Sequence, residues 1–591
     1  MNKMKVLITR GFIAVVTLIC SNRSNAQLVD WRNVKNGNLI ATNGYCDQPY
    51  AVVLKDGSWL CVYTTGATAE GTGGQHIVSC NSKDQGKTWT KTVAIENPGT
   101  ESASWAMPYL TKYGRVYVFY DYNGDKIHEL NGKKNIREDM LGWYCYKYSD
   151  DEGKTWSQRY RLNVPVSKID LNNDWQGKVQ ILWGIGKPVD VDGGMMFAFS
   201  KMAKYLIDGT EGWFFRCDNI NSEKNPGKLK WQLFPGSGEG LKNEKLGPIN
   251  EEQNIFQLSN GTLYCMERTI SGHPAESYSY NGGKTWTVPK VPEYLTGIEM
   301  KNPRACPRIW KCKNGKYLFW HHNNGSWNFT SRNPAWISGG IEKNGKIIWS
   351  QPEILLYEDE ISKRMSYPDL IEQNGKYWIT ETNKEEAKTN EIPTDFLNML
   401  WSQFDIKTVA SKNLVQEWKQ EDLVAKSKIN IPVRDYKSGF TLDLRLSLGE
   451  LLSGQIILSS SNNGKSVVLK TGEYGAIEIV LKDGTDSSKW ASDPGLIPAY
   501  GEYSVSVIVD NGPKIIQFVI DGTVCDGRDF RQYGWGRFNL KMEDFIFNMI
   551  EMGTLANGQL QPQGKVTSLR VYNRPLMNTE GIGNHNNFTK Q

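Results

Sequence analysis

Short runs of alternating apolar and polar residues, separated by turn residues, extend along most of the chain. One such run covers Tyr50 to Leu54, an Asp-Gly turn follows at positions 56 and 57, and a second run extends from Trp59 to Tyr63. The same pattern recurs around Asn-Gly turns that begin at positions 260, 314 and 374. An Asn-Gly or Asp-Gly pair between two such runs predicts a β-hairpin. The segment from about residue 28 to residue 404 is therefore predicted to be a series of antiparallel strand pairs.

An octapeptide of the form Ser-x-Asp-x-Gly-x-Thr-Trp occurs three times within this series. Copies begin at Ser82 and Ser149, and a third copy, from Ser279 to Trp286, has Asn281 in place of the Asp. The Asp accepts backbone N–H bonds, the Gly supplies a position of positive φ, and the Trp packs between neighbouring sheets. An amide oxygen accepts the same bonds, so Asn281 should preserve the turn. Three copies at these intervals predict a β-propeller, and the length fits about six blades.

A second β-rich unit follows a more polar connection. Three segments, at 440–444, 503–507 and 516–520, alternate as sandwich strands do. The ending from Leu569 to Leu576 resembles the last strand of a laminin-G or concanavalin-like jelly roll. We therefore predict an all-β chain, a six-bladed β-propeller followed by a β-sandwich (jelly roll). The predicted boundaries are a signal peptide at 1–26, the propeller at 27–405, a linker at 406–435, the sandwich at 436–580 and a tail at 581–591.

Charge and the first residues narrow the possible partners and location. The chain has 69 basic and 64 acidic residues and no long basic run, which argues against nucleic acid as a partner. Basic residues precede an apolar stretch at 11–20, and small residues stand before Gln27, as in a cleavable secretory signal. We expect a secreted or periplasmic protein. Ile19 stands where a lipobox has a small residue before Cys20, which argues against lipid anchoring, and no other stretch is apolar and long enough to span a membrane.

Cysteine usage favours a packed core over a metal site or a disulfide framework. Removing the predicted signal leaves nine cysteines, an odd number, and most of them lie in apolar, strand-like segments. A buried thiol behaves as a small apolar side chain. No Cys-x-x-Cys pair and no run of calcium-binding acidic residues occurs, so we expect no cofactor; a structural calcium ion has no motif behind it.

The octapeptide is the Asp-box of the sialidase superfamily, and this chain resembles that family. The boxes are structural in the family, so function has to rest on other residues. The resemblance implies hydrolysis of a terminal acidic sugar. In sialidases a Tyr is the nucleophile, a Glu activates it, an Asp is the acid/base, and three Arg bind the carboxylate of the sugar. A phenol needs a neighbouring base to react, and a guanidinium matches a carboxylate with two hydrogen bonds.

The resemblance implies which residues of this chain fill several of these roles. The stretch from Asn250 to Leu258, followed by Gly261 and Leu263, resembles the segment with the catalytic Glu, which implies Glu252 or Glu251 as the base and Arg268 as one carboxylate-binding Arg. Because neighbours on a strand point to opposite faces, we expect only one Glu to face the pocket, and the spacing to Arg268 favours Glu252.

The remaining Arg and the nucleophile are placed in the same way. Arg332, in the phrase from Ser331 to Trp336, falls where the next family Arg is expected, with Arg304 and Arg308 as competitors. Tyr367 matches the nucleophile, since it lies in a Ser-Tyr-x-x-Leu strand that precedes a second strand ending at Glu381.

Two positions depart from the family pattern. Gln48 stands where the first Arg belongs, so one third of the carboxylate-binding set is missing. No Asp occurs between residues 56 and 84, where the acid/base is expected. His76 is the preferred substitute, because an imidazole both donates and accepts a proton near neutral pH, and Glu70 is the second choice.

Three functions remain open from the sequence. The first is an exo-acting, sialidase-like glycoside hydrolase that removes a terminal sialic, keto- or uronic-acid sugar. The second is a lyase that cleaves a rhamnose-glucuronate or ulvan-type polysaccharide by elimination, with His76 and Tyr367 as acid and base. The third is a glycan-binding protein without catalysis, although the retained Tyr and Glu argue against it. Trp490, Tyr533 and Trp535 of the jelly roll are expected either to stack on sugar or to pack.

Overall fold

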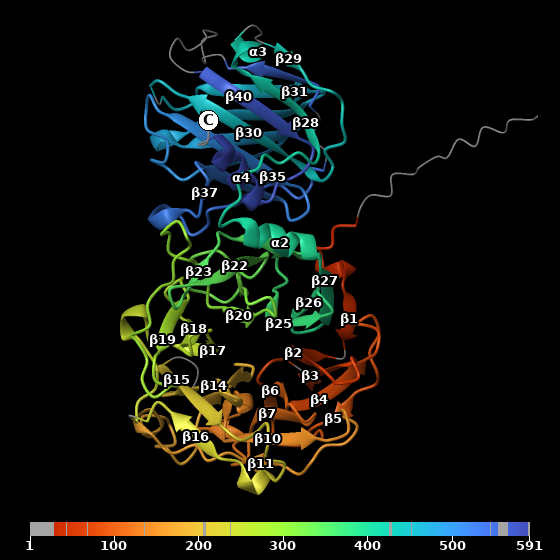
Figure 1. Ribbon diagram of the computed structural model, residues 1–591, viewed down its shortest axis with the longest axis vertical. Coiled ribbons are helices and arrows are strands. Elements are labelled where there is room, and N and C mark those ends of the chain that lie inside the picture. Colours follow the sequence, from red (N-terminus) through yellow and green to blue (C-terminus); the bar gives the residue numbers. More distant parts are fainter. Residues whose placement is uncertain are drawn as a thin grey trace, which may run out of the picture.

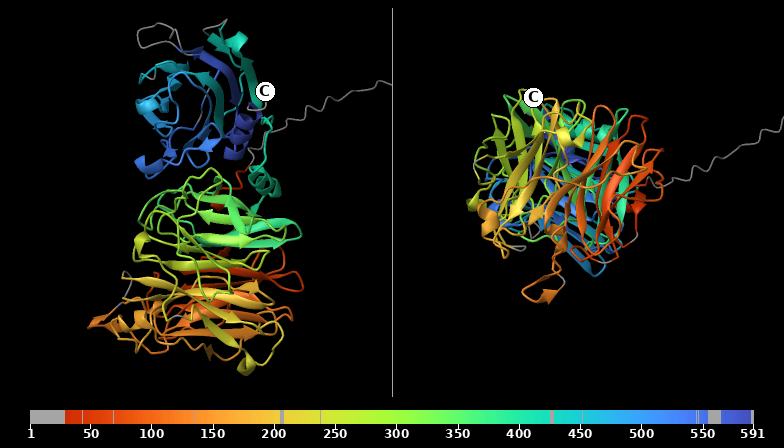
Figure 2. Two further views of the ribbon diagram at one scale, coloured as in Figure 1. Left: turned by 60° about the vertical axis from the view of Figure 1, so that its left-hand side comes forward. Right: turned by 90° about the horizontal axis from the view of Figure 1, so that it is seen from below.

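The computed structural model describes residues 29–588, apart from 43, 68, 135, 205–207, 237, 425–427, 451, 544, 546 and 554–564. The predicted signal peptide and the lipid-anchor question concern residues outside this described part. Figures 1 and 2 show two units, a ring of sheets formed by the first two thirds of the chain and a smaller unit packed against one side of the ring. No helix in the described part is long and apolar enough to cross a membrane.

Six antiparallel sheets, numbered here in chain order, surround a common centre in the described residues of the first unit (Figure 1). Sheet 1 contains β2 (Tyr45–Val53), β3 (Trp59–Gly66), β4 (His76–Ser82) and β5 (Val93–Ala94). Sheet 2 contains β6 (Ala103–Leu110), β7 (Val116–Tyr122), β10 (Trp143–Ser149) and β11 (Tyr160–Arg161), beside a small hairpin of β8 (Glu129–Leu130) and β9 (Lys133–Lys134). Sheet 3 contains β12 (Leu182–Trp183), β13 (Val189–Val191), β14 (Gly194–Met202), β15 (Thr210–Cys217) and β16 (Trp231–Phe234).

The last three sheets complete the ring. Sheet 4 contains β17 (Glu251–Gln257), β18 (Leu263–Arg268) and β19 (Ala275–Ser279). Sheet 5 contains β20 (Arg308–Lys311), β21 (Tyr317–His321), β22 (Ala335–Lys343), β23 (Lys346–Trp349) and β24 (Glu353–Leu356). Sheet 6 contains β25 (Ser366–Gln373), β26 (Lys376–Thr382), β27 (Ala387–Ile392) and, as its outer strand, β1 (Asn38–Ala41) from the start of the chain. This pairing of β1 with β27 joins the two ends of the ring within one sheet.

The second unit consists of two larger antiparallel sheets. Sheet 7 contains β28 (Leu414–Lys419), β30 (Gly439–Ser447), β35 (Glu502–Asp510), β36 (Ile515–Ile520), β37 (Thr523–Val524), β38 (Gly536–Arg537) and β40 (Lys565–Tyr572). Sheet 8 contains β29 (Lys428–Asn430), β31 (Ile456–Asn462), β32 (Lys465–Thr471), β33 (Ile477–Asp483), β34 (Asp486–Ala491) and β39 (Met549–Met552). Their inward-facing Leu, Ile, Val and Phe side chains form one continuous core. The α-helices of the described part are α1 (Lys168–Leu171), α2 (Thr394–Ser402), α3 (Gln420–Val424) and α4 (Asn578–Phe588).

Two segments that the sequence pattern assigns to a linker and a tail have regular structure. Within 406–435, β28 pairs with β40 and β29 pairs with β39, so the predicted linker supplies strands to the second unit. Residues 581–588 of the predicted tail form most of α4. Glu353 of sheet 5 accepts hydrogen bonds from the backbone N–H groups of Asn578 and Thr579 at the start of this helix. The backbone groups of a strand edge and of a helix N-terminus need hydrogen-bond partners. Here those partners come from distant parts of the chain, so the short polar sequences of the two segments do not predict their regular structure.

The three octapeptides form the same turn, as predicted. In the first copy Asp84 accepts from the backbone N–H of Thr88 at 2.9 Å, and Gly86 donates its N–H to the Ser82 hydroxyl at 2.8 Å. In the third copy Asn281 Oδ1 accepts from the Thr285 N–H at 2.9 Å, which confirms that an amide replaces the carboxylate in this turn. The Trp side chains pack between sheets; Trp286, for example, stacks on Phe214 of sheet 3 with ring centroids 4.6 Å apart.

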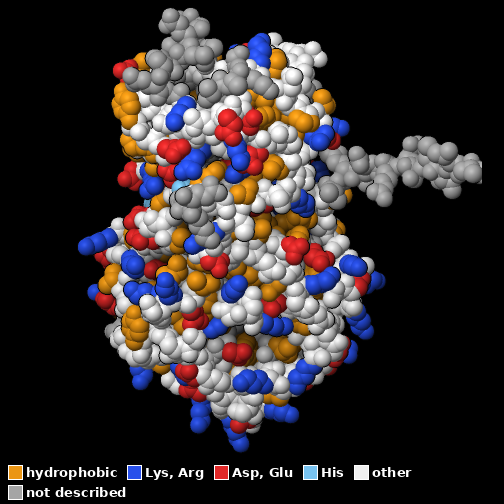
Figure 3. Space-filling model, turned by 45° about the horizontal axis from the view of Figure 1, so that its top comes forward, with side chains coloured by type: hydrophobic (Ala, Val, Ile, Leu, Met, Phe, Trp, Pro, Cys, Tyr) orange, Lys and Arg blue, Asp and Glu red, His pale blue; other side chains and the backbone are white. Residues whose placement is uncertain are grey.

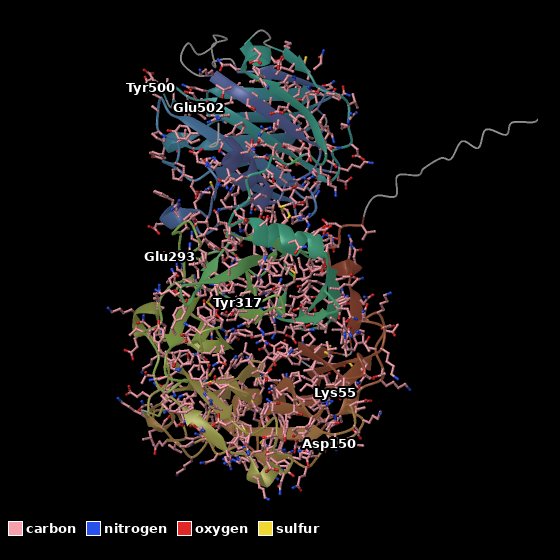
Figure 4. All side chains as sticks on the ribbon, in the orientation of Figure 1. Lys55, Asp150, Glu293, Tyr317, Tyr500 and Glu502 are labelled. Atoms are coloured by element: carbon pink, nitrogen blue, oxygen red, sulfur yellow. The ribbon has the colours of Figure 1, made fainter. Side chains whose placement is uncertain are left out.

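Side chains fill the spaces between neighbouring sheets. Tyr317, labelled in Figure 4, packs with Tyr264 and Trp349 in the cluster between sheets 4 and 5. The nine cysteines of the described part are all buried, which confirms that they pack in the core. Basic and acidic side chains are interspersed on the face shown in Figure 3, in keeping with their nearly equal numbers.

Candidate active site

β-Bulges occur near the start of four strands that border the centre of the ring. The strand register breaks within the first residues of β2, β6, β17 and β25. One residue in each bulge has the left-handed backbone conformation, which is rare without glycine and costs on the order of 1–3 kcal/mol. A bulge redirects a side chain out of the regular alternation. The four residues, with their φ values, are Gln48 (56°), Trp105 (67°), Glu252 (55°) and Tyr367 (43°).

Two of these redirected side chains meet. The Tyr367 hydroxyl donates a hydrogen bond to Glu252 Oε1 at 2.8 Å, and Trp183 Nε1 donates to the same oxygen at 3.1 Å. Burial raises the pKa of Glu252, and burial together with the Glu252 charge raises the pKa of Tyr367 well above its usual value. The resting phenol is therefore protonated, and the carboxylate is placed to accept its proton.

Arg268 binds both neighbouring glutamates. Its Nη1 lies 2.6 Å from Glu252 Oε1, and its Nη2 lies 2.6 Å from Glu251 Oε1. The expectation that only one of the two glutamates faces the pocket is wrong, because the bulge in β17 interrupts the alternation on which it rested. The two residues still differ, since it is Glu252 that accepts from Tyr367.

Arg332 is hydrogen-bonded to the residue that precedes Tyr367. Its Nη1 donates to the Ser366 hydroxyl at 2.9 Å, and its Nη2 donates to the Arg304 carbonyl at 2.6 Å. The side chain is buried, and burial lowers its pKa. Arg268 and Arg332 both oppose the rise in the pKa of Tyr367, so both positive charges act on the phenol.

The two competing arginines have different surroundings. Arg304 is partly exposed and reaches Glu251 Oε1 with Nη2 at 3.3 Å, so it adds a third cation to the rim of the cluster. Arg308 is buried, donates Nη1 to the Ile185 carbonyl and to Asn254 Oδ1, and lies 4.6 Å from the centre of the Tyr50 ring. These contacts fix Arg308 in the packing between strands.

Gln48 is buried at the first bulge, and neither of its amide atoms has a hydrogen-bond partner among the described residues. A nearby cation, Lys384, lies beyond the end of β26. Its Nζ lies 4.3 Å from the centre of the Tyr367 ring and 2.6 Å from Asp47 Oδ2. Sequence reasoning missed Lys384, because no motif marks it; only its place just after the second strand of the Tyr367 sheet connects it with the site.

The two acid/base candidates lie in different places. Glu70 lies 3.1 Å from Arg137 Nη2 and 3.4 Å from Lys384 Nζ. Burial raises its pKa, but the charges of Lys384 and Arg137 outweigh burial and bring the pKa of Glu70 to about 2. Its charge is also one of those that raise the pKa of Tyr367.

His76 begins β4, and its Nδ1 lies 3.4 Å from the Gly74 carbonyl. Within the described residues it makes no hydrogen bond or ion pair with the Tyr367 cluster. The structure therefore places Glu70, the second choice from the sequence, nearer to Tyr367. No group of His, Cys, Asp and Glu in the described part is arranged to hold a metal ion.

The chain matches a known family model over its central part. Residues 105–379 match the BNR repeat-like domain. The chain is thus similar to the BNR-repeat proteins of the sialidase superfamily. It is 25% identical over 231 residues to a sialidase of Clostridium perfringens, covering 37% of this chain and 55% of that protein. It is 22% identical over 217 residues to a sialidase of Paraclostridium sordellii, covering 36% and 49%. The aligned part thus spans about half the length of these relatives.

Solved sialidase structures are also similar to this chain at low identity. Trypanosoma rangeli sialidase in complex with sialic acid has a TM-score of 0.42 and 12% identity, covering 93% of this chain and 94% of that one. The intramolecular trans-sialidase from Ruminococcus gnavus has a TM-score of 0.44 and 14% identity, covering 62% and 98%.

Proposed function

We propose that this protein is a sialidase-type glycoside hydrolase that removes a terminal acidic sugar from a glycan. The observation that supports this proposal most is the hydrogen bond from the Tyr367 hydroxyl to Glu252 Oε1, at 2.8 Å. This bond lies in a buried site that also holds the guanidinium groups of Arg268 and Arg332. We further propose that the six sheets are the blades of a six-bladed propeller and that sheets 7 and 8 form a jelly roll. The protein would act after export by the predicted signal peptide.

In the proposed reaction, Arg268 and Arg332 bind the carboxylate of the sugar and hold its anomeric carbon beside Tyr367. The phenol oxygen attacks that carbon while Glu252 takes the phenol proton, and the bond to the leaving oxygen breaks. Glu70 gives the leaving oxygen a proton and then removes one from the water that attacks the anomeric carbon of the tyrosyl intermediate. In that step the bond between this carbon and the Tyr367 oxygen breaks, and Glu252 returns its proton to the phenol. Glu70 is ionised in the free protein, so it must first gain a proton, which becomes easier if the substrate carboxylate draws Lys384 away.

Lys384 is proposed to supply the positive charge that the family obtains from the Arg at the position of Gln48. Replacing Lys384 with Met should raise KM for an acidic glycoside by about 10- to 100-fold, since a hydrogen bond to a charged group contributes about 1.5–3 kcal/mol. Steady-state kinetics of Lys384→Met and Lys384→Arg would measure this, and the Arg variant should retain most of the affinity.

Lys388→Met provides a matched control, because Lys388 pairs with Glu386 at 2.9 Å and makes no hydrogen bond or ion pair with Tyr367 among the described residues. An unchanged KM in Lys384→Met, with the melting temperature of the wild type, would contradict the assignment.

The activity itself is tested by product analysis. The mature protein would be incubated with sialylated, uronate-capped and ulvan-type glycans, and the products separated by anion-exchange chromatography with ultraviolet detection. A released saturated acidic sugar is the expected result. An unsaturated, ultraviolet-absorbing uronate would instead establish elimination, and no product from any glycan would favour a binding protein without catalysis.

A further inference from the structure

One loop of the ring connects the candidate active site with the second unit. It comprises residues 322–334, between β21 and β22, and is called the bridging loop here. Arg332 of this loop reaches the Tyr367 cluster, whereas its neighbours contact the second unit. The Tyr533 hydroxyl donates to Ser331 Oγ at 3.0 Å, and Arg537 Nη2 donates to the Asn333 carbonyl at 3.0 Å. The two units are therefore in contact directly beside the proposed carboxylate-binding arginine.

Further contacts fix the position of the second unit on this loop. Trp535 Nε1 donates to the Asn323 carbonyl at 2.9 Å, and the Gly325 N–H donates to the Gln532 carbonyl at 2.9 Å. Lys301 Nζ donates to three backbone carbonyls of the second unit, at distances of 2.6 to 3.0 Å. Several hydrogen bonds between the same two surfaces hold a junction in one geometry.

An open cavity of about 320 Å³ lies at this junction, within the size range of small-molecule sites. Its walls include three aromatic side chains of the second unit, parts of the bridging loop and one residue of a later loop of the ring: Trp490, Tyr533, Trp535, Thr330, Arg332 and Ile361. Gly536 keeps the wall close to Trp490, because a Cβ at position 536 would come within 2.2 Å of the indole ring. Aromatic walls with a few polar groups are typical of ligand sites.

The polar groups of this cavity suit neutral hydroxyl groups. No Asp or Glu belongs to the described lining, so it offers no carboxylate to a cation, and both Nη atoms of Arg537 already donate to the backbone carbonyls of Pro513 and Asn333, which leaves them less available to a second anion. Arg332 Nε is buried and has no hydrogen-bond partner among the described residues, so one donor beside the cavity is unused. Thr330, an exposed residue, adds a hydroxyl that donates to Asn328 Oδ1 at 2.7 Å and remains available as an acceptor.

We propose that this cavity binds the neutral sugars of the glycan that carries the acidic sugar. Arg332 is common to the cavity and to the Tyr367 cluster, so a chain whose acidic end lies beside Tyr367 can continue along the bridging loop to the aromatic wall. The second unit thus contributes to substrate binding. The expected effect of this cavity on KM rests on the proposed hydrolase function, whereas the binding of neutral sugars does not.

Kinetics with two substrates test the proposal. One substrate is an aryl glycoside of the acidic sugar, and the other carries the same sugar on a neutral oligosaccharide. In Trp490→Ala, KM for the oligosaccharide should rise about three- to tenfold more than KM for the aryl glycoside, since an aromatic contact contributes about 0.5–1.5 kcal/mol. Ile361→Trp, which narrows the opening from an exposed position, should have the same effect without removing a packed side chain.

Tyr500→Ala is the control, because Tyr500 is an exposed aromatic residue of the second unit away from the cavity (Figure 4). Equal changes for both substrates, or no change for either in both variants, would overturn the proposal.

A binding experiment separates this proposal from the hydrolase function. Saturation-transfer NMR of wild-type protein with the neutral oligosaccharide alone should detect contact, and Trp490→Ala and Ile361→Trp should each weaken it at least threefold. Binding without hydrolysis of any glycan would retain the cavity and reject the function. Hydrolysis with no neutral-sugar binding, or binding only of sulfated oligosaccharides, would retain the function and reject the proposed occupant.

Discussion

Replacing Tyr367 with Phe should lower the rate of glycoside hydrolysis at least about 10³-fold. The nucleophile and its base act together, so removing the nucleophile removes nearly all of the rate enhancement that the two provide jointly. The phenol oxygen is the only atom removed, and the hydrogen bond to Glu252 at 2.8 Å is lost with it. Initial rates with an aryl glycoside of an acidic sugar would measure the effect.

The matched control for this variant is Tyr144→Phe. Tyr144 is also buried, lies in sheet 2, and its hydroxyl has no hydrogen-bond partner in the described part of the chain. Its removal should leave kcat close to that of the wild type. If Tyr367→Phe retained more than a tenth of the activity while both variants melted like the wild type, Tyr367 would not be the nucleophile.

Replacing Glu252 with Gln should lower kcat by about 10²- to 10⁴-fold, the usual range for a general base. The amide keeps the shape of the side chain but cannot take the proton of Tyr367 readily. Glu251→Gln is the natural comparison, since both glutamates contact Arg268 but only Glu252 accepts from the phenol. We expect a markedly smaller loss of kcat in Glu251→Gln.

Circular dichroism and thermal melting should accompany both variants, because each one weakens a buried charge pair with Arg268. Equal losses of kcat in the two variants, at equal stability, would mean that the pair acts only as a support for Arg268 and would remove Glu252 from the role of base.

The sequence predicts the repeating framework of this protein well because its signals are local. Each octapeptide fixes its own turn through bonds within a few residues, as Asn281 and Thr285 do. The site depends on contacts between distant segments, which local patterns do not contain. The bulge that lets Glu251 and Glu252 share Arg268 cannot be predicted from the sequence, because a bulged strand and a regular strand have the same apolar pattern.

Long-range contacts also explain why the sequence favours His76 and does not mark Lys384. The sequence favours His76 by its residue type and its position in the chain, whereas in the structure the loop before β4 brings the Glu70 carboxylate to Arg137 and Lys384. Lys384 can be assigned to the site only from the three-dimensional structure, since its partners Asp47 and Glu70 lie more than 300 residues earlier in the chain.

The pairing of β1 with β27 has a consequence for how the chain is made. Asn38 pairs with Thr389, about 350 residues later, so β1 has no partner strand until nearly two thirds of the protein has been synthesised. At translation speeds of about 5–20 residues per second this delay is roughly 20 to 70 s. During that time the edge of an incomplete ring is open to pairing with other nascent chains, and a product truncated before β27 would keep that aggregation-prone edge permanently.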